Sequence, residues 1–201
     1  CTIMGTLEYY PLVEKFKAEH QTPLMDVDHS PYPEKTHTPD SEIEVAEFQQ
    51  AWKELKDTHD FFGLLRKYKV NRTQGFRLAP EGFTQKIDNE SVIRMLQKAS
   101  KTATPIMCFL HSKGCVQIHS GPVKKLQFYG DWYNVLDPRF NLHLSMPAVK
   151  ESWIVKKPTV DGIVTSLELF DEEGNQIVYF FGARKPGKAE LEAWRAIIQE
   201  V

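Results

Sequence analysis

The chain has 201 residues, which is long enough for one sizeable core, or for one domain with an attached segment. Apolar residues make up 41% of it and charged residues 26%, and this balance excludes an intrinsically disordered chain. The formal net charge of −2 argues against a nucleic-acid-binding protein, because nucleic-acid binding needs a basic field over the domain. No apolar run approaches the roughly 20 residues of a membrane span, so no span is predicted.

The first 40 residues differ from the rest of the chain. Residues 1–18 contain apolar side chains at helical spacing, and we predict a helix there. Residues 19–40 hold four prolines among polar residues, which predicts a stiff, extended linker. The segment 7–13 is similar to the segment 191–197, so the first helix could be the closing helix of a preceding repeat that this chain lacks. Residues 41–201 then form the main domain.

Helical spacing predicts four helices between residues 41 and 104. Ser41 and Glu44 have the spacing of a capping box, and the first helix follows them. Asp57 and Thr58 offer an N-cap for a second helix that runs to about Tyr68. Residues 72–78 form a short third piece, and a fourth helix carries apolar residues from 92 to 99.

From residue 105 the apolar period changes to two. Strands are predicted near 105–111, 114–120, 123–129, 132–136, 140–145, 151–157, 162–170 and 176–182. Close turn signals between them favour an antiparallel meander. A closing helix with Leu191, Trp194 and Ile197 follows Pro186-Gly187. The predicted fold class is α+β: N-terminal helices, a large antiparallel β-meander sheet and a closing C-terminal helix.

A few side chains stand out as candidates for a binding site. His59 opens a helix beside Phe61 and Phe62, where its ring could face an apolar cleft, although a core or helix-start histidine explains the same pattern. Five basic residues follow helices or strands or end a strand: Arg72, Lys156, Lys157, Arg184 and Lys185. If they converge they would bind carboxylates or a phosphate, and otherwise they are solvated strand-end charges. No zinc-hydrolase, nucleophile-elbow or phosphate-loop motif is present.

Four segments resemble the second half of the HemS/HmuS/ShuS (ChuS)-type haem-utilisation family. They are DTHDFF (57–62), KGCVQI (113–118), KPTVDG (157–162) and TSLELF (165–170). The resemblance runs from about Leu7 to the C-terminus. It implies that this chain is the C-terminal half of a cytoplasmic bacterial protein built from two repeats, with residues 1–18 as the tail of the first repeat.

The resemblance also implies residue roles. His59 would be the axial ligand of haem iron, and Arg72, Lys157 and Arg184 would contact the haem propionates. Phe62 and Phe181 would lie against the porphyrin, although the family usually has a tyrosine where this chain has Phe181. The family's distal arginine lies in the first half, so we expect an exposed distal side here. No catalytic residue is predicted in this chain.

The function implied by the resemblance is haem binding in bacterial haem uptake and iron utilisation. One alternative is haem-oxygenase-like degradation by the complete two-repeat protein, and another is a self-association domain that binds no haem. The implied partners are haem itself, the missing N-terminal repeat or a second copy in a dimer, and a haem importer or an electron donor.

Overall fold

The computed structural model describes residues 5–22, 37–112 and 115–201. The helices are α1 (Gly5–Phe16), α2 (Val45–Lys53), α3 (Asp60–Tyr68), α4 (Arg72–Arg77), α5 (Ser91–Lys101) and α6 (Glu192–Gln199), with 3-10 turns at Asp40–Glu42 and Met146–Ala148. The strands are β1 (Thr84–Ile87), β2 (Ile106–His111), β3 (Val116–Gly121), β4 (Leu126–Tyr129), β5 (Trp132–Asp137), β6 (Phe140–Ser145), β7 (Glu151–Thr159), β8 (Gly162–Phe170) and β9 (Gln176–Gly182). The α+β class with a large antiparallel sheet and a C-terminal helix is confirmed.

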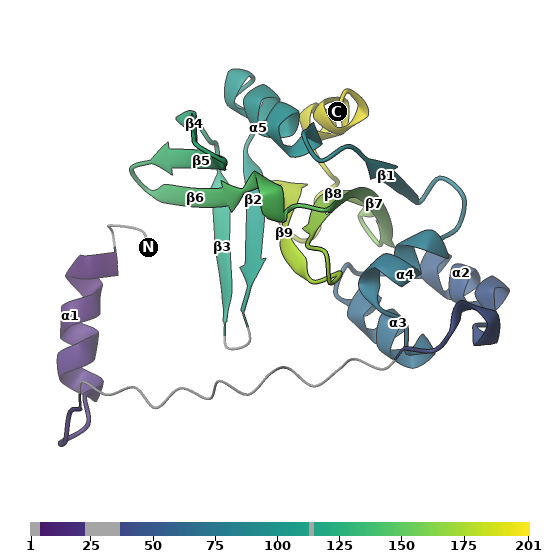
Figure 1. The fold of residues 1–201 in the computed structure, drawn as a ribbon, viewed down its shortest axis with the longest axis horizontal. Helices are drawn as coiled ribbons and strands as arrows, with labels where there is room; N and C mark the ends of the chain where they lie inside the picture. The colour runs from purple at the N-terminus through teal and green to yellow at the C-terminus, as the bar shows by residue number, and fades with distance from the viewer. Residues whose placement is uncertain (1–4, 23–36, 113–114) are drawn as a thin grey trace.

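The strands form two antiparallel sheets (Figure 1). The larger has six strands in the order β1-β7-β8-β9-β2-β3, and the smaller has the order β4-β5-β6. The predicted meander is present within β7-β8-β9 and within β4-β5-β6. The β2-β3 hairpin, however, joins the edge of β9 by long-range pairing, with Ile106 opposite Gly182. This pairing places residues near 110 beside residues near 180.

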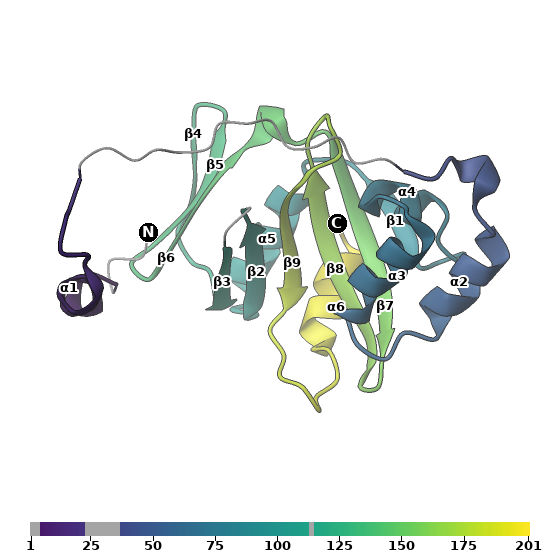
Figure 2. The same cartoon turned by 90° about the horizontal axis from the view of Figure 1, so that it is seen from below.

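The six-stranded sheet buries its two faces against different elements. Because side chains alternate along a strand, one face of β7, β8 and β9 packs with α5, α6 and the small sheet into the main core. The other face of β7 and β8 packs under α2, α3 and α4 into a second, aromatic core that contains Phe48, Trp52, Phe61, Phe76 and Phe170. Figure 2 shows β9, β2 and β3 extending beyond these three helices.

The helix starts differ from the sequence prediction. Ser41 lies in a 3-10 turn, and α2 begins at Val45 with no side-chain cap, so the predicted capping box is absent. The capping box forms instead at α4, where Asn71 Oδ1 accepts from Gln74 N at 2.7 Å and Gln74 Oε1 accepts from Asn71 N at 3.2 Å. The short strand β1, which pairs with β7, had no alternating pattern long enough to predict it.

The first helix is confirmed as α1, and it lies to one side of the body in Figure 1. Its side chains Tyr10, Leu12 and Phe16 are exposed. Of the predicted linker 19–40, residues 23–36 lie outside the described residues. The origin of α1 as the closing helix of a preceding repeat stays a prediction. Within the described ranges, no helix has the length and apolar character to cross a membrane.

Gly182 is expected to tolerate no side chain, because it is where α6 approaches β9. A Cβ there would lie 2.6 Å from Trp194 Cβ and Cγ. Trp194 is fully buried, and its indole donates to Thr165 O at 2.9 Å, so the ring has no room to move. Gly182→Ala should lower the free energy of unfolding by about 1–3 kcal/mol in urea denaturation.

The matched control is Gly63→Ala in α3, where a new Cβ meets nothing within 4 Å. Alanine is the better helix former, so this variant should gain about 0.5–1 kcal/mol. Equal stabilities for the two variants would show that the close approach of α6 to Gly182 does not constrain the fold.

Candidate functional site

Three aromatic side chains gather on one face of the larger sheet beside the helices; Tyr179 and Phe181 are buried, at 8% and 9% exposed, and Phe109 is half-buried. Phe109 of β2 and Tyr179 and Phe181 of β9 share one face, opposite Val178 and Phe180, which enter the main core. The rings of Phe109 and Tyr179 stack at 5.0 Å, and the ring of Phe181 meets both edge-on. We call these three residues the aromatic floor. On the same face, Val116 and Ile118 of β3 remain exposed.

The helices form a wall beside this floor. Phe62 of α3 is 45% exposed, although Phe61 and Phe76 of the same two helices are fully buried and Tyr68 is half-buried. Arg72 begins α4, and its guanidinium carbon lies 5.2 Å from the ring centre of Phe62 and 5.6 Å from that of Tyr179. Arg72 therefore joins wall and floor. We call Phe62, Arg72 and the aromatic floor together the corner.

Two of the predicted cations, Arg72 of the corner and Lys157 beneath it, pair with one carboxylate that the sequence did not single out. Glu168 of β8 is fully buried; its Oε2 accepts from Arg72 Nε at 2.6 Å, and its Oε1 accepts from Lys157 Nζ at 2.6 Å. Ser166 and Gln176 also donate to it. Burial would raise the pKa of Glu168, but the charges and hydrogen bonds of Arg72 and Lys157 outweigh burial and hold it well below its usual range.

Lys157 is therefore not a solvated strand-end charge. Its side chain is 2% exposed, and its ammonium lies 5.1 Å from the ring centre of Phe61 and 5.6 Å from that of Phe181. Lys156 points to the opposite face of β7 and is exposed. Phe61, which follows His59 closely in the sequence, is fully buried and packs against Trp52 with a ring-centre distance of 4.6 Å.

His59 directly precedes α3, and its side chain is 89% exposed. The imidazole Nδ1 lies 2.5 Å from Asp57 Oδ1, and the same oxygen accepts from the His59 backbone N at 2.8 Å. These hydrogen bonds, the backbone bond first, lower the pKa of Asp57. The carboxylate occupies one ring nitrogen, and Nε2 has no hydrogen-bond partner among the described residues.

Arg184 lies at the end of the floor strand, three residues after Phe181. Its Nη2 donates to Asp161 Oδ2 at 2.8 Å, and this hydrogen bond is the main reason why the pKa of Asp161 is lowered. The positive charge of Arg184 also acts on Asp57, the partner of His59. Because Val160 N donates to Lys56 O at 2.9 Å, the β7-β8 turn is tied to the segment before His59.

Tyr179 carries a hydroxyl into the floor. Its oxygen lies 2.6 Å from His111 Nε2, and the two rings stack at 5.2 Å. Burial raises the pKa of Tyr179 to about 12, so its phenol stays neutral at physiological pH. Tyr179 is not among the residues that the sequence predicted for the site. The alternation of Tyr179 and Phe181 along one strand face was the available signal.

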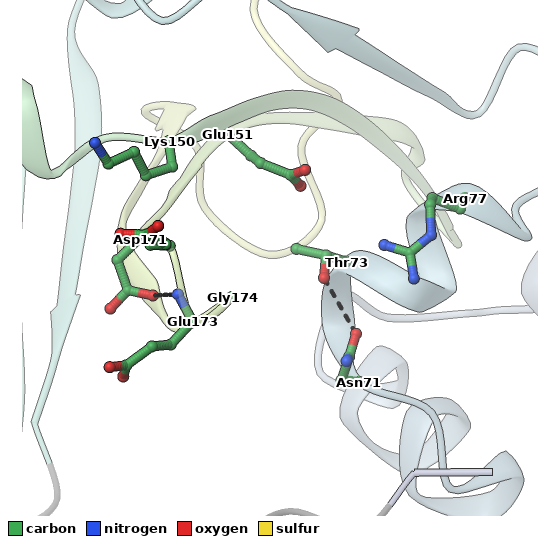
Figure 3. A pocket seen from close by; sticks show the side chains of 9 residues that line it. Asn71, Thr73, Arg77, Lys150, Glu151, Asp171, Glu173 and Gly174 are labelled. Carbon is green, nitrogen blue, oxygen red and sulfur yellow. Dashed lines mark hydrogen bonds between the residues drawn. The ribbon is translucent and has the colours of Figure 1, made fainter. Parts of the chain in front are cut away.

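A separate hollow of about 440 Å³ lies between α4 and the β8-β9 turn (Figure 3). It is lined by Asn71, Thr73, Arg77, Lys150, Glu151, Asp171, Glu172, Glu173 and Gly174. Its lining is polar, with charges of both signs, and includes no predicted site residue. It has no aromatic side chain, and its acidic residues outnumber its basic ones. The corner, which combines aromatic side chains with cations, is therefore the candidate site.

The fold and the corner together define an α+β domain in which stacked aromatic side chains and two clustered cations lie beside the exposed ring of Phe62, with the exposed imidazole of His59 at the start of the same helix. The family model described as the haemin-degrading HemS.ChuX domain matches residues 69–201. The chain therefore belongs to the HemS/ChuX family, as the sequence segments suggested. This establishes the family of the domain.

Known relatives agree with this assignment. The hemin transport protein HmuS of Yersinia pestis is 41% identical over 144 residues, which are 72% of this chain and 42% of HmuS. The structure of apo-PhuS, a heme-binding protein from Pseudomonas aeruginosa, is 42% identical with a TM-score of 0.87, over 96% of this chain and 56% of PhuS. The heme degrading enzyme ChuS of Escherichia coli O157:H7 is 33% identical with a TM-score of 0.80, over 97% and 55%. The chain thus spans about half the length of these relatives.

Proposed function

We propose that the corner binds haem, with His59 as the axial iron ligand. Phe62 and Phe181 contact the porphyrin in this proposal, and Arg72 faces a propionate. Lys157, buried beneath Arg72, adds its positive charge to the site. Arg184 adds positive charge on the side of the site where His59 lies. The proposal is supported by the names of the relatives, since PhuS is a heme-binding protein and HmuS a hemin transport protein.

The chemistry of the residues present fits such a ligand. Haem is a flat apolar ring with an iron that takes an axial ligand and with two carboxylates that need cations. The ring of Phe62 is 45% exposed and offers apolar area to such a ligand, and burial of apolar surface contributes about 25 cal/mol per Å². Among the described residues, no three His, Cys, Asp or Glu side chains are grouped to hold a bare metal ion. A lone exposed imidazole instead suits a metal whose other ligands come from a macrocycle, where bound iron supplies ligand-binding and redox chemistry.

The observation that carries the proposal is the pairing of His59 Nδ1 with Asp57. A histidine that ligates a metal usually donates its other ring N–H to a carboxylate or carbonyl, which fixes the tautomer and the ring orientation. Here Asp57 holds Nδ1, and the exposed Nε2 is left for the iron. Titration of the chain with haemin should produce a Soret band that saturates at one haem per chain. No spectral change beyond that of free haemin would refute haem binding.

Asp57→Ala should weaken haem binding about 10- to 100-fold, the usual cost of losing an outer partner of a metal-bound histidine. The Soret band should still form, because His59 remains. The variant should fold normally, since Asp57 is exposed. Haemin titration of both proteins measures the difference, with Glu54→Ala on the neighbouring exposed surface as the control. Equal affinities for wild type and Asp57→Ala would argue that Asp57 does not orient the ligand.

Haem degradation is a second candidate function, supported by the likeness to ChuS, which is a heme degrading enzyme. It belongs to the longer two-repeat protein in our proposal, because this chain spans about half of such relatives. Incubation of the haem complex with a reductant and oxygen separates the two functions: loss of the Soret band with formation of an open tetrapyrrole indicates breakdown, and a stable band indicates binding alone.

The partners and the cellular location follow from the same proposal. We place the protein in the cytoplasm, where it receives imported haem from an importer and, in its complete form, electrons from a donor. A preceding repeat or a second copy would cover the exposed side of the haem. A self-association domain without haem would show concentration-dependent mass in sedimentation and no Soret band.

A further inference from the structure

Two cations share one carboxylate beneath the corner, and the carboxylate comes from the centre of the sheet. Glu168 accepts from Arg72, Lys157, Ser166 and Gln176, so both of its oxygens are saturated. Its side chain is fully buried, and those of Lys157 and Arg72 are 2% and 11% exposed. Such a carboxylate cannot reorient without breaking several hydrogen bonds at once.

Arg72 is held in one orientation by this carboxylate. Its Nε and Nη2 both donate to Glu168, at 2.6 and 3.1 Å, which is the two-pronged geometry that fixes a guanidinium plane. The guanidinium also lies against the rings of Phe62 and Tyr179. The third nitrogen, Nη1, has no hydrogen-bond partner among the described residues. Of Arg72, Lys157 and Glu168, Arg72 has the most exposed side chain.

The ion cluster formed by Arg72, Lys157 and Glu168 has a net positive charge. Arg72 and Lys157 bring two positive charges and Glu168 brings one negative charge, so one positive charge remains. That excess matches one carboxylate. Lys157 is covered by Phe61 and Phe181 and is held by Glu168 and Ser166, so it contributes its charge without reaching the surface.

We propose that Glu168 is a positioning residue, which fixes Arg72 so that Nη1 receives a single carboxylate of the ligand while Lys157 acts only through the shared ion cluster. The inference rests on the proposed haem function and deepens it. It assigns one propionate to the Arg72 cluster and leaves the other to a different part of the site. Glu168 itself never touches the ligand.

The test compares haemin with its dimethyl ester, which has the same ring and iron but no carboxylates. The ratio of the two affinities isolates the carboxylate contribution. Wild type should prefer haemin by about 10- to 100-fold, as expected for a charge-assisted hydrogen bond. Arg72→Met should lower that ratio by the share that its own propionate supplies, whatever its effect on binding of the ester, and should keep the Soret maximum in place.

Glu168→Gln distinguishes positioning from simple charge. The variant makes the cluster more positive, so charge alone would strengthen the preference for haemin. Loss of positioning would instead reduce it toward the value of Arg72→Met. We expect the reduction, with binding of the ester unchanged. An increased or unchanged preference would overturn the inference.

A second variant keeps the net charge constant and guards against a folding defect. Lys157→Met with Glu168→Met removes one charge of each sign, and replacing a buried ion pair by apolar side chains of similar size is often neutral for stability. Its preference for haemin should also fall, with an unchanged thermal transition. Equal losses for haemin and the ester in both variants would mean that Glu168 supports only the fold, and a shifted Soret maximum would place the cluster at the iron. Either result would overturn the inference.

Failure of the inference about Glu168 and failure of the proposed haem binding give different results. If wild type binds haemin and its ester equally well, haem binding stands and the positioning role of Glu168 fails. If wild type binds neither porphyrin, the proposed function itself is wrong.

Discussion

Replacing His59 with alanine should abolish iron coordination while leaving the fold intact. The imidazole is 89% exposed, so its removal opens no cavity and breaks no core contact. We expect the Soret band of the complex to revert toward that of free haemin and the affinity to fall by more than about 100-fold, since losing even an outer partner of a metal-bound histidine costs about 10- to 100-fold.

Haemin titration followed at the Soret maximum measures this effect, with circular dichroism and the thermal transition as checks on folding. His20→Ala is the matched control, because His20 is also exposed and lies outside the corner. Free imidazole added to the His59→Ala complex should restore part of the Soret shift by supplying the missing nitrogen. An unchanged spectrum in His59→Ala would refute the assignment of the iron ligand.

Glu168→Ala should be the most destabilising single change in the site. It leaves Arg72 and Lys157 as unpaired cations in a buried setting, and breaking a buried ion pair on one side costs about 3–5 kcal/mol. Urea denaturation at neutral pH should show this loss in the free energy of unfolding. The control is Lys86→Ala, which breaks the exposed ion pair with Glu151, where the cost should stay below about 1 kcal/mol.

The loss of stability caused by Glu168→Ala should depend on pH. The pKa of Glu168 is lowered in the folded state, so its stabilising contribution is present above the unfolded value of about 4.3 and is lost only as the pH falls through the folded value. Burial lowers the pKa of Lys157 to about 8, so the stability difference between wild type and Glu168→Ala also changes as Lys157 titrates near that pH. In acid, the difference should narrow as the pH falls from about 4.3 toward the folded pKa of Glu168. A difference that vanishes at neutral pH would show that the cluster does not support the fold.

Local patterns in the sequence were enough to predict most of the elements. The period-two alternation of residues such as Ile163, Thr165 and Leu167 gave β8, and the helical spacing of Val92, Met95 and Leu96 gave α5. These patterns are reliable because they arise within one segment from its own burial. The helix caps were predicted less well, since Ser41 and Asn71 are both good caps and tertiary contacts decide which is used.

For the candidate site, too, the sequence predicted some residues and not others. The segments 57–62, 157–162 and 165–170 identified the family by themselves, and with it His59, Arg72 and Lys157 as candidates. No local pattern indicated that Phe61 would enter the core while Phe62 would lie at the surface. Two adjacent residues on a helix point about 100° apart, and the packing of α3 against α2 and the sheet decides which of them is covered.

By itself, then, the sequence determined the α+β class, the order of the elements and the residues that carry the family resemblance, because these depend on spacing within short segments. Only the tertiary structure decided that β2 pairs with β9, that this pairing packs Phe109 against Tyr179 and Phe181, and that Glu168 is the common partner of Arg72 and Lys157. Arg72 and Glu168 are 96 residues apart. A carboxylate finds its cations across such a separation only through the strand order and the placement of the helices, which no local pattern records.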